Sequence, residues 1–217
     1  MMIDLFNVAV RNLAGTWHDG YRDICSKVRD VKNWNDPDDA SDELIKHLIY
    51  DSNNGVSYVG MAFLNWPLPR PSVGKYRKML ARLKDGFGKR YPGDEVLRCW
   101  EEFRRITDGK GSPSIFNRMV AAFQPGIVSP VMSENDFDNA CYKLVKGGYV
   151  NPVRPMIGEY PWYSKNVQLM KQVRELLPDG HSETTVMPID DYSRGMFVWG
   201  IHEQVNMDEW IILRNAR

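Results

Sequence analysis

The residues that most often carry catalysis are few in this chain, and their spacing argues against a shared site. Cys25, Cys99 and Cys141 are far apart, and each falls within an apolar stripe of helical period. Thiols in such stripes are expected to be buried and free, in a reducing compartment. A Cys-His nucleophile is therefore disfavoured, because it would need one of these thiols beside a histidine. The histidines are His18, His47, His181 and His202.

Metal and acid–base sites are no better supported. Zinc-binding spacings such as C-x-x-C are absent, and so is the phosphate-binding pattern G-x-x-x-x-G-K-[ST]. Asp190, Asp191 and Glu203 suggest a nuclease cluster, but Asp190 and Asp191 stand where a helix N-terminus favours acids. His202-Glu203 matches half of a deaminase signature, without the P-C-x-x-C that should follow. We predict no catalytic residue, no metal and no cofactor.

Basic residues concentrate in the middle of the chain, although the formal net charge is zero. Residues 71–118 carry 12 basic and 6 acidic side chains, against 7 and 10 in residues 1–70 and 9 and 12 in residues 119–217. Such a segment can bind a phosphate backbone, and a solvated amphipathic helix is the competing interpretation. The predicted nucleic-acid-binding set is Lys75, Arg77, Lys78, Arg82, Lys84, Lys89 and Arg90.

Aromatic residues offer a second kind of binding site. Trp66, Trp162 and Trp199 are candidates for a cage around a flipped base, because they lie in or beside predicted loops or off the main apolar stripe. Packing in the core, or at its rim, is the competing interpretation for each. The turn Asn53-Asn54-Gly55 can face a ligand, or it can simply end a helix.

The elements that must position these residues are predicted to be helical. Apolar residues recur every three or four positions along most of the chain, with Gly, Pro, Asn and capping residues at the breaks. The predicted helices cover 6–31, as one long helix or two collinear ones with Gly15 and Gly20 as the weak points, and 41–50, 72–87, 94–106, 112–123, 133–146, 164–177 and 192–205. We expect helices 112–123 and 133–146 to form a hairpin at the centre of the core. Pro130 limits segment 127–132 to an edge strand or a connector, and the tail 208–217 is a short helix or an edge strand.

These patterns predict a mainly α fold, a single irregular bundle of about eight helices with at most a few short strands. One domain spanning 1–217 is long enough to bury a full core. Two subdomains, 1–66 and 72–217, joined by the Pro-rich segment 67–71, are the alternative. No run is long enough to span a bilayer and the first residues lack the features of a signal peptide, which favours a cytoplasmic protein.

Four stretches resemble the region that precedes the motor in McrB-like AAA+ proteins of modification-dependent restriction systems. They are LIYDSNNGVSYVG (48–60), FNRMVAAFQPGIVSPVMSENDF (116–137), WYSKNVQLM (162–170) and FVWGIHEQV (197–205). The chain departs from the family pattern at His202, where the family has Tyr, and at 58–60, where Tyr-Val-Gly replaces the usual Arg-Gly.

The resemblance implies a non-enzymatic recognition module of a restriction or phage-defence system. An AAA+ motor or a nuclease subunit would be its partner, because this chain has no phosphate-binding loop of its own. The first hypothesis is DNA binding through the basic segment 72–90. The second is a protein–protein interaction adaptor that uses exposed aromatic residues near the C-terminal helix. A small hydrolase built on the Pro-rich loops, the third, would need a pocket with convergent titratable groups.

Overall fold

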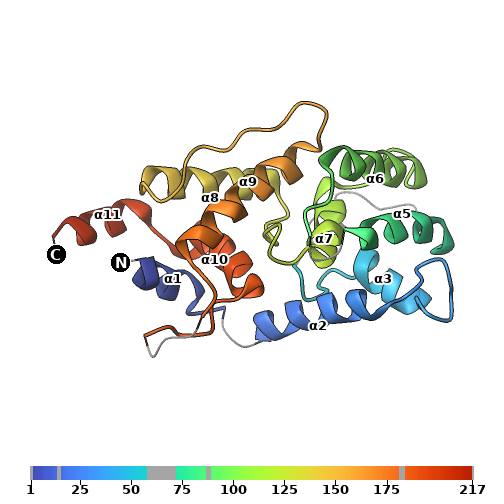
Figure 1. The fold of residues 1–217 in the computed structure, drawn as a ribbon, viewed down its shortest axis with the longest axis horizontal. Coiled ribbons are helices and arrows are strands. Elements are labelled where there is room, and N and C mark those ends of the chain that lie inside the picture. The colour runs from blue at the N-terminus through green and yellow to red at the C-terminus, as the bar shows by residue number, and fades with distance from the viewer. Residues whose placement is uncertain (1, 14–15, 58–71, 87–88, 181–183, 217) are drawn as a thin grey trace.

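Two central helices, α7 (Pro113–Phe123) and α10 (Asp191–Gln204), are buried on nearly every side, and the other helices pack around them (Figure 1). The computed structural model describes residues 2–13, 16–57, 72–86, 89–180 and 184–216. Helix α7 is buried at every position from Ile115 to Phe123. Helix α10 is buried along most of its length. A helix that is apolar on most of its circumference needs neighbours on all sides, which explains this arrangement.

Ten helices are present in the described part of the chain, and no strand is found there. Besides α7 and α10, they are α1 (Met2–Val10), α2 (Thr16–Asp30), α3 (Asp42–Tyr50), α5 (Gly74–Asp85), α6 (Gly93–Ile106), α8 (Glu134–Lys146), α9 (Pro161–Leu176) and α11 (Met207–Asn215). The predicted mainly α fold is confirmed. The predicted number of helices was low, because region 6–31 divides into α1 and α2 and the tail forms α11.

One continuous core joins the N-terminal helices to the rest of the chain. α1 packs along α10, while α2 packs against both α7 and α10. Buried apolar residues from all of these helices belong to one cluster, so the chain forms a single domain. The segment 67–71, predicted as a possible subdomain linker, lies outside the described residues.

Glycine allows two pairs of backbones to come unusually close. A Cβ on Gly200 of α10 would lie 2.0 Å from the carbonyl oxygen of Ala9 in α1, a distance that no side chain can occupy. A Cβ on Gly55, whose φ is +84°, would lie 2.5 Å from the carbonyl oxygen of Gly20 in α2. Gly20 therefore lies inside α2 despite its low helix propensity, because the turn after α3 packs directly against it.

The predicted hairpin of helices 112–123 and 133–146 is wrong as a packing unit. α7 packs mainly against α2 and α3, whereas α8 packs mainly against α10. The connector between them is buried, and its backbone finds side-chain partners instead of a neighbouring strand. The Asn166 amide pairs with both the N–H and the carbonyl of Ser129, at 2.8 and 3.3 Å, and the Trp162 indole donates to the carbonyl of Val131 at 2.9 Å.

Capping side chains set several helix ends where the sequence indicates them. The Ser133 hydroxyl accepts a hydrogen bond from the backbone N–H of Asp136, and Asp190 forms a capping box with Ser193 at the start of α10. The predicted start of α9 at Ser164 is wrong, because Pro161 already occupies the first helical turn. None of the helices in the described ranges is long and apolar enough to cross a membrane.

Candidate nucleic-acid interface

Two lysines of the basic segment lie on the exposed face of α5. Lys75 and Lys78 are one turn apart and exposed, while Tyr76, Met79 and Leu80 on the opposite side are buried. Neither lysine has a hydrogen-bond or ion-pair partner within the described ranges. The amphipathic pattern of this helix therefore leaves two ammonium groups, one turn apart, available to an anionic partner.

Arg77, from the same predicted set, lies inside the protein. Its guanidinium is buried and donates to the carbonyl of Ala40 at 2.5 Å and to the Asp42 carboxylate at 2.6 Å. Longer bonds reach the carbonyls of Trp34 and Asp36, at 3.4 and 3.3 Å. Arg77 thus fastens α5 to the loop ahead of α3, and its predicted place on a phosphate-binding surface is corrected.

Arg82 and Lys84 are also engaged with the protein itself. Arg82 pairs with Glu102 of α6 at 2.9 Å, which joins the two helices. Lys84 donates to the carbonyls of Val28 and Arg29 at the C-terminal end of α2, where a cation is favoured by the helix dipole. Partial burial lowers the pKa of Lys84. Both side chains have structural contacts that phosphate binding would have to replace.

Lys89 and Arg90 follow α5 and are both exposed. The Arg90 guanidinium lies 3.7 Å from the Glu159 carboxylate, which packs against Gly93 at the first turn of α6. The weak pair leaves more than half of the Arg90 side chain exposed. Four cations of the predicted set therefore reach solvent: Lys75, Lys78, Lys89 and Arg90.

The tryptophans predicted as a base-binding cage do not form one in the described residues. Trp162 is buried and bonded to the connector ahead of α8, so it belongs to the core, and its predicted recognition role is corrected. Trp199 is half-buried, and its ring meets that of Trp17 edge to face at a centroid distance of 5.1 Å. Trp66 lies outside the described residues.

The Asn53-Asn54-Gly55 turn ends α3, as the competing interpretation had it. The Asn54 amide is buried and donates to the carbonyl of Leu48, while its oxygen accepts from the N–H of Val56. An amide with both ends used in this way closes a helix and has little left for a ligand.

Burial suppresses the reactivity of the three thiols. It raises the pKa of Cys99 and of Cys141 to about 12, and that of Cys25 still further. At neutral pH all three are protonated, and the thiolate is the nucleophilic form. In the described ranges no group of three or more His, Cys, Asp or Glu side chains is arranged to hold a metal ion.

Asp190 and Asp191 are positioned by packing around the start of α10. Burial opposes ionisation of Asp190, but hydrogen bonding to His18 and to Ser193 outweighs it and lowers the pKa. Asp191 accepts from Arg194 at 2.8 Å and from Arg174 at 2.6 Å. Both carboxylates thus have structural partners, in agreement with the capping interpretation of the sequence.

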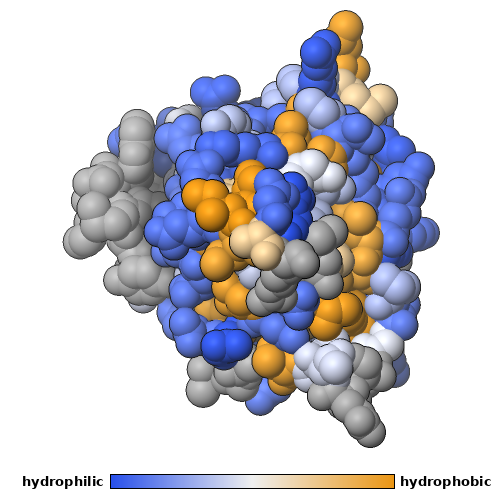
Figure 2. Space-filling view, turned by 90° about the vertical axis from the view of Figure 1, so that its left-hand side faces the viewer, coloured by the Kyte–Doolittle hydropathy of each residue, from blue (hydrophilic) through white to orange (hydrophobic). Residues whose placement is uncertain are grey.

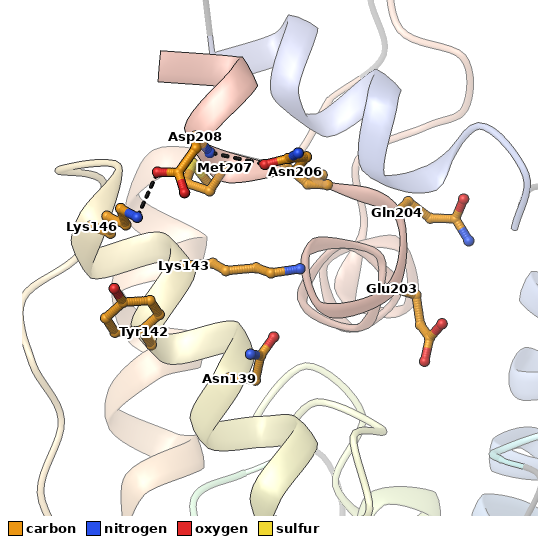
Figure 3. A pocket seen from close by; sticks show the side chains of 10 residues that line it. Asn139, Tyr142, Lys143, Lys146, Glu203, Gln204, Asn206, Met207 and Asp208 are labelled. Carbon is orange, nitrogen blue, oxygen red and sulfur yellow. Dashed lines mark hydrogen bonds and ion pairs between the residues drawn. The ribbon is translucent and has the colours of Figure 1, made fainter. Parts of the chain in front are cut away.

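A surface hollow of about 460 Å³ lies between α8 and the α10–α11 connection (Figure 3). Both lysines that line it already have partners within the protein. Lys143 donates to the carbonyl of His202 at 2.6 Å, and Lys146 pairs with Asp208 at 2.5 Å. The remaining lining residues are Asn139, Tyr142, Glu203, Gln204, Val205, Asn206 and Met207. Because both ammonium groups already have partners within the protein, the hollow offers no free cation to a ligand.

The segment before α9 is the surface feature that sequence reasoning missed. Met156 and Ile157 at its far end are exposed. Prolines 152 and 155 and the glycine at 158 were the available signal, because they indicate an extended stretch that ends in a tight turn.

No family model, curated protein or solved structure matches this chain.

Proposed function

We propose that this chain is a non-enzymatic recognition module that binds duplex DNA through Lys75, Lys78, Lys89 and Arg90. The observation that carries the proposal is the pair Lys75 and Lys78, which are exposed, one turn apart and without a partner in the described residues. Phosphate contacts of this type give affinity without reading base sequence.

The biological setting follows from the family resemblance. The module would belong to a restriction or phage-defence system of the McrB-like kind, in which a separate AAA+ motor or nuclease subunit acts on the bound DNA. The order of the four similar stretches supports this assignment, since they include parts of α3, α7, α8, α9 and α10 in turn.

Salt dependence tests the DNA proposal. Fluorescence anisotropy with a duplex of about 20 base pairs is expected to show binding whose logarithm falls linearly with the logarithm of salt concentration. The double variant K75Q/K78Q should reduce the magnitude of that slope by about 2, because each lost phosphate contact removes close to one unit. The charge-matched control K27Q/K171Q, with exposed lysines on α2 and α9, should leave it unchanged. Absence of wild-type binding at low salt would exclude DNA as the partner.

Exposed apolar side chains on α11 favour a protein–protein interaction adaptor as the second candidate. Ile212 and Leu213 are 68% and 60% exposed, and Tyr142 of α8 is also exposed. Figure 2 shows that hydrophobic residues reach the surface of this end of the molecule in several places. Large aliphatic groups held in water on a helix are typical of a surface that a second chain covers.

Sedimentation velocity tests the simplest form of this second candidate, association of two copies. A reversible dimer is expected in a concentration series, and I212D/L213D should convert it to monomer by placing two carboxylates in the contact. The same variant should bind DNA as the wild type does. A wild type that stays monomeric at every concentration would contradict self-association.

A further inference from the structure

The connection from α8 to α9 ends in a turn that holds an isoleucine entirely in solvent. Ile157 has a fractional exposure of 104%, and Met156 beside it is 47% exposed. The backbone N–H of Glu159 donates to the carbonyl of Met156 at 3.2 Å, and Gly158 has a φ of +79°. These are the features of a β-turn with glycine where a positive φ is needed. In Figure 1 this connection runs along the upper edge of the molecule and turns back into α9.

Side chains of α9 hold the connection in place along its length. Gln172 pairs with both backbone groups of Asn151, and Gln168 accepts from the N–H of Arg154 and donates to its carbonyl. The Ser164 hydroxyl accepts from the N–H of Met156 at 3.1 Å. Residues spaced by four on one helix thus take the place of a neighbouring strand, and the exposed turn is pre-organised before it meets a partner.

The turn has exposed basic residues near it. Arg154 and Lys89 are exposed, and Arg90 lies against Glu159 within the turn. Acids lie nearby as well: Glu159 is largely buried beside Arg90, and Asp94 and Glu95 share the single guanidinium of Arg98. An apolar tip among exposed cations complements a polyanion whose interior is apolar, which is the chemistry of stacked bases between two phosphate backbones.

We propose that Ile157, supported by Met156, is a wedge that enters between two stacked base pairs of bound duplex DNA. This inference rests on the proposed function and adds to it the way in which the duplex is deformed. Isoleucine and methionine are among the side chains that proteins insert at base steps from the minor groove, where they unstack the step and kink the helix. Arg154 and Arg90 then hold the phosphates on either side of the kink.

The energetics favour a pre-organised wedge. Unstacking one step costs a few kcal/mol, which the burial of an exposed aliphatic side chain and the added phosphate contacts offset. A flexible loop would lose conformational entropy on insertion, whereas hydrogen bonds with Ser164, Gln168 and Gln172 of α9 already order this connection. Pyrimidine–purine steps unstack most easily, so a TA step is the preferred site.

The test uses the whole chain and a duplex with a single central TA step. End-to-end energy transfer between two dyes reports bending, and 2-aminopurine in the TA step reports unstacking. The wild type is expected to raise both signals several-fold. I157A should retain the salt slope of binding, lose both signals and bind about 10-fold more weakly, since phosphate contacts remain while the wedge is gone. V186A, which truncates another exposed aliphatic residue outside both proposed binding surfaces, is the control and should behave as the wild type.

Failure of the wedge and failure of the proposed function are distinguishable. If I157A bends and unstacks the duplex as the wild type does, the wedge is excluded while DNA binding stands. If the wild type does not bind the duplex at low salt, both proposals fall. If I157A instead dissolves an oligomer in sedimentation, the turn is a contact for a protein partner and the wedge is overturned.

Discussion

Replacing Gly200 by alanine is expected to destabilise the fold by about 3 kcal/mol, at the upper end of what one added methyl group usually costs in a packed core. The added Cβ would lie 2.0 Å from the carbonyl oxygen of Ala9. That oxygen belongs to the backbone of α1, so no change of side-chain conformation relieves the overlap. α1 must move away from α10, which opens the contact along its whole length.

Urea unfolding followed by circular dichroism measures this loss. G74A is the matched control, because a Cβ on Gly74 at the start of α5 meets nothing within 4 Å. Alanine is the better helix former there, so G74A should keep or raise the stability by up to about 1 kcal/mol. Wild-type stability in G200A would show that α1 and α10 do not approach as closely as described.

Replacing Arg118 by methionine is the second large change, with an expected loss of roughly 2–4 kcal/mol. The guanidinium in the central helix α7 is fully buried and donates to the carbonyls of Asp51 at 2.6 Å and Ile49 at 3.1 Å. These carbonyls end α3, where the helix dipole favours a cation. Methionine fills similar space but leaves both carbonyls without their donor.

Arg118 stays positively charged although it is buried. Desolvation lowers its pKa to about 10, so the side chain is still protonated at neutral pH. R118K should recover part of the loss, because an ammonium reaches the same carbonyls with fewer donors in a fixed geometry. R105M, which removes an exposed arginine of α6, should change the free energy of unfolding by less than about 0.5 kcal/mol. Equal stabilities for R118M and R105M would contradict a structural role for Arg118.

Helix positions were predictable because their signals are local. The spacing of apolar residues marks the buried face of α5 and α6, and Ser133 and Asp190 mark two helix starts with their own side chains. The predicted helix boundaries were wrong where contacts with another part of the chain determine them. Ser164 has the side chain of a typical N-cap, but it lies within α9, which begins at Pro161. Its hydroxyl accepts a hydrogen bond from the backbone of the preceding connection instead of capping the helix.

The candidate site was only partly predictable, because a helical wheel shows which residues share a face and not what covers it. Lys75 and Lys78 were placed correctly on an exposed face. Arg77 and Lys84 were predicted to bind phosphate in the same way, but their side chains donate hydrogen bonds to carbonyls of the 34–40 loop and of the end of α2. These partners are 37 to 56 residues away in sequence, and nothing in the local pattern indicates them.

The turn at Ile157 was missed for the same reason. Proline and glycine indicate a break in regular structure, but they do not indicate whether tertiary contacts order the connecting segment. The glutamines that hold it belong to α9 and are half-buried, and nothing in their local sequence indicates that they bind the preceding segment.

The contact between α1 and α10 has a consequence for how the protein is made. Gly200 lies 191 positions after Ala9 in the sequence, so it leaves the ribosome much later than Ala9 does. Until then the apolar side of α1 has no permanent cover, so the nascent chain must wait or be shielded by a chaperone. Completion of this core is thus coupled to translation of α10, and a ribosome stalled before α10 should leave the apolar side of α1 uncovered.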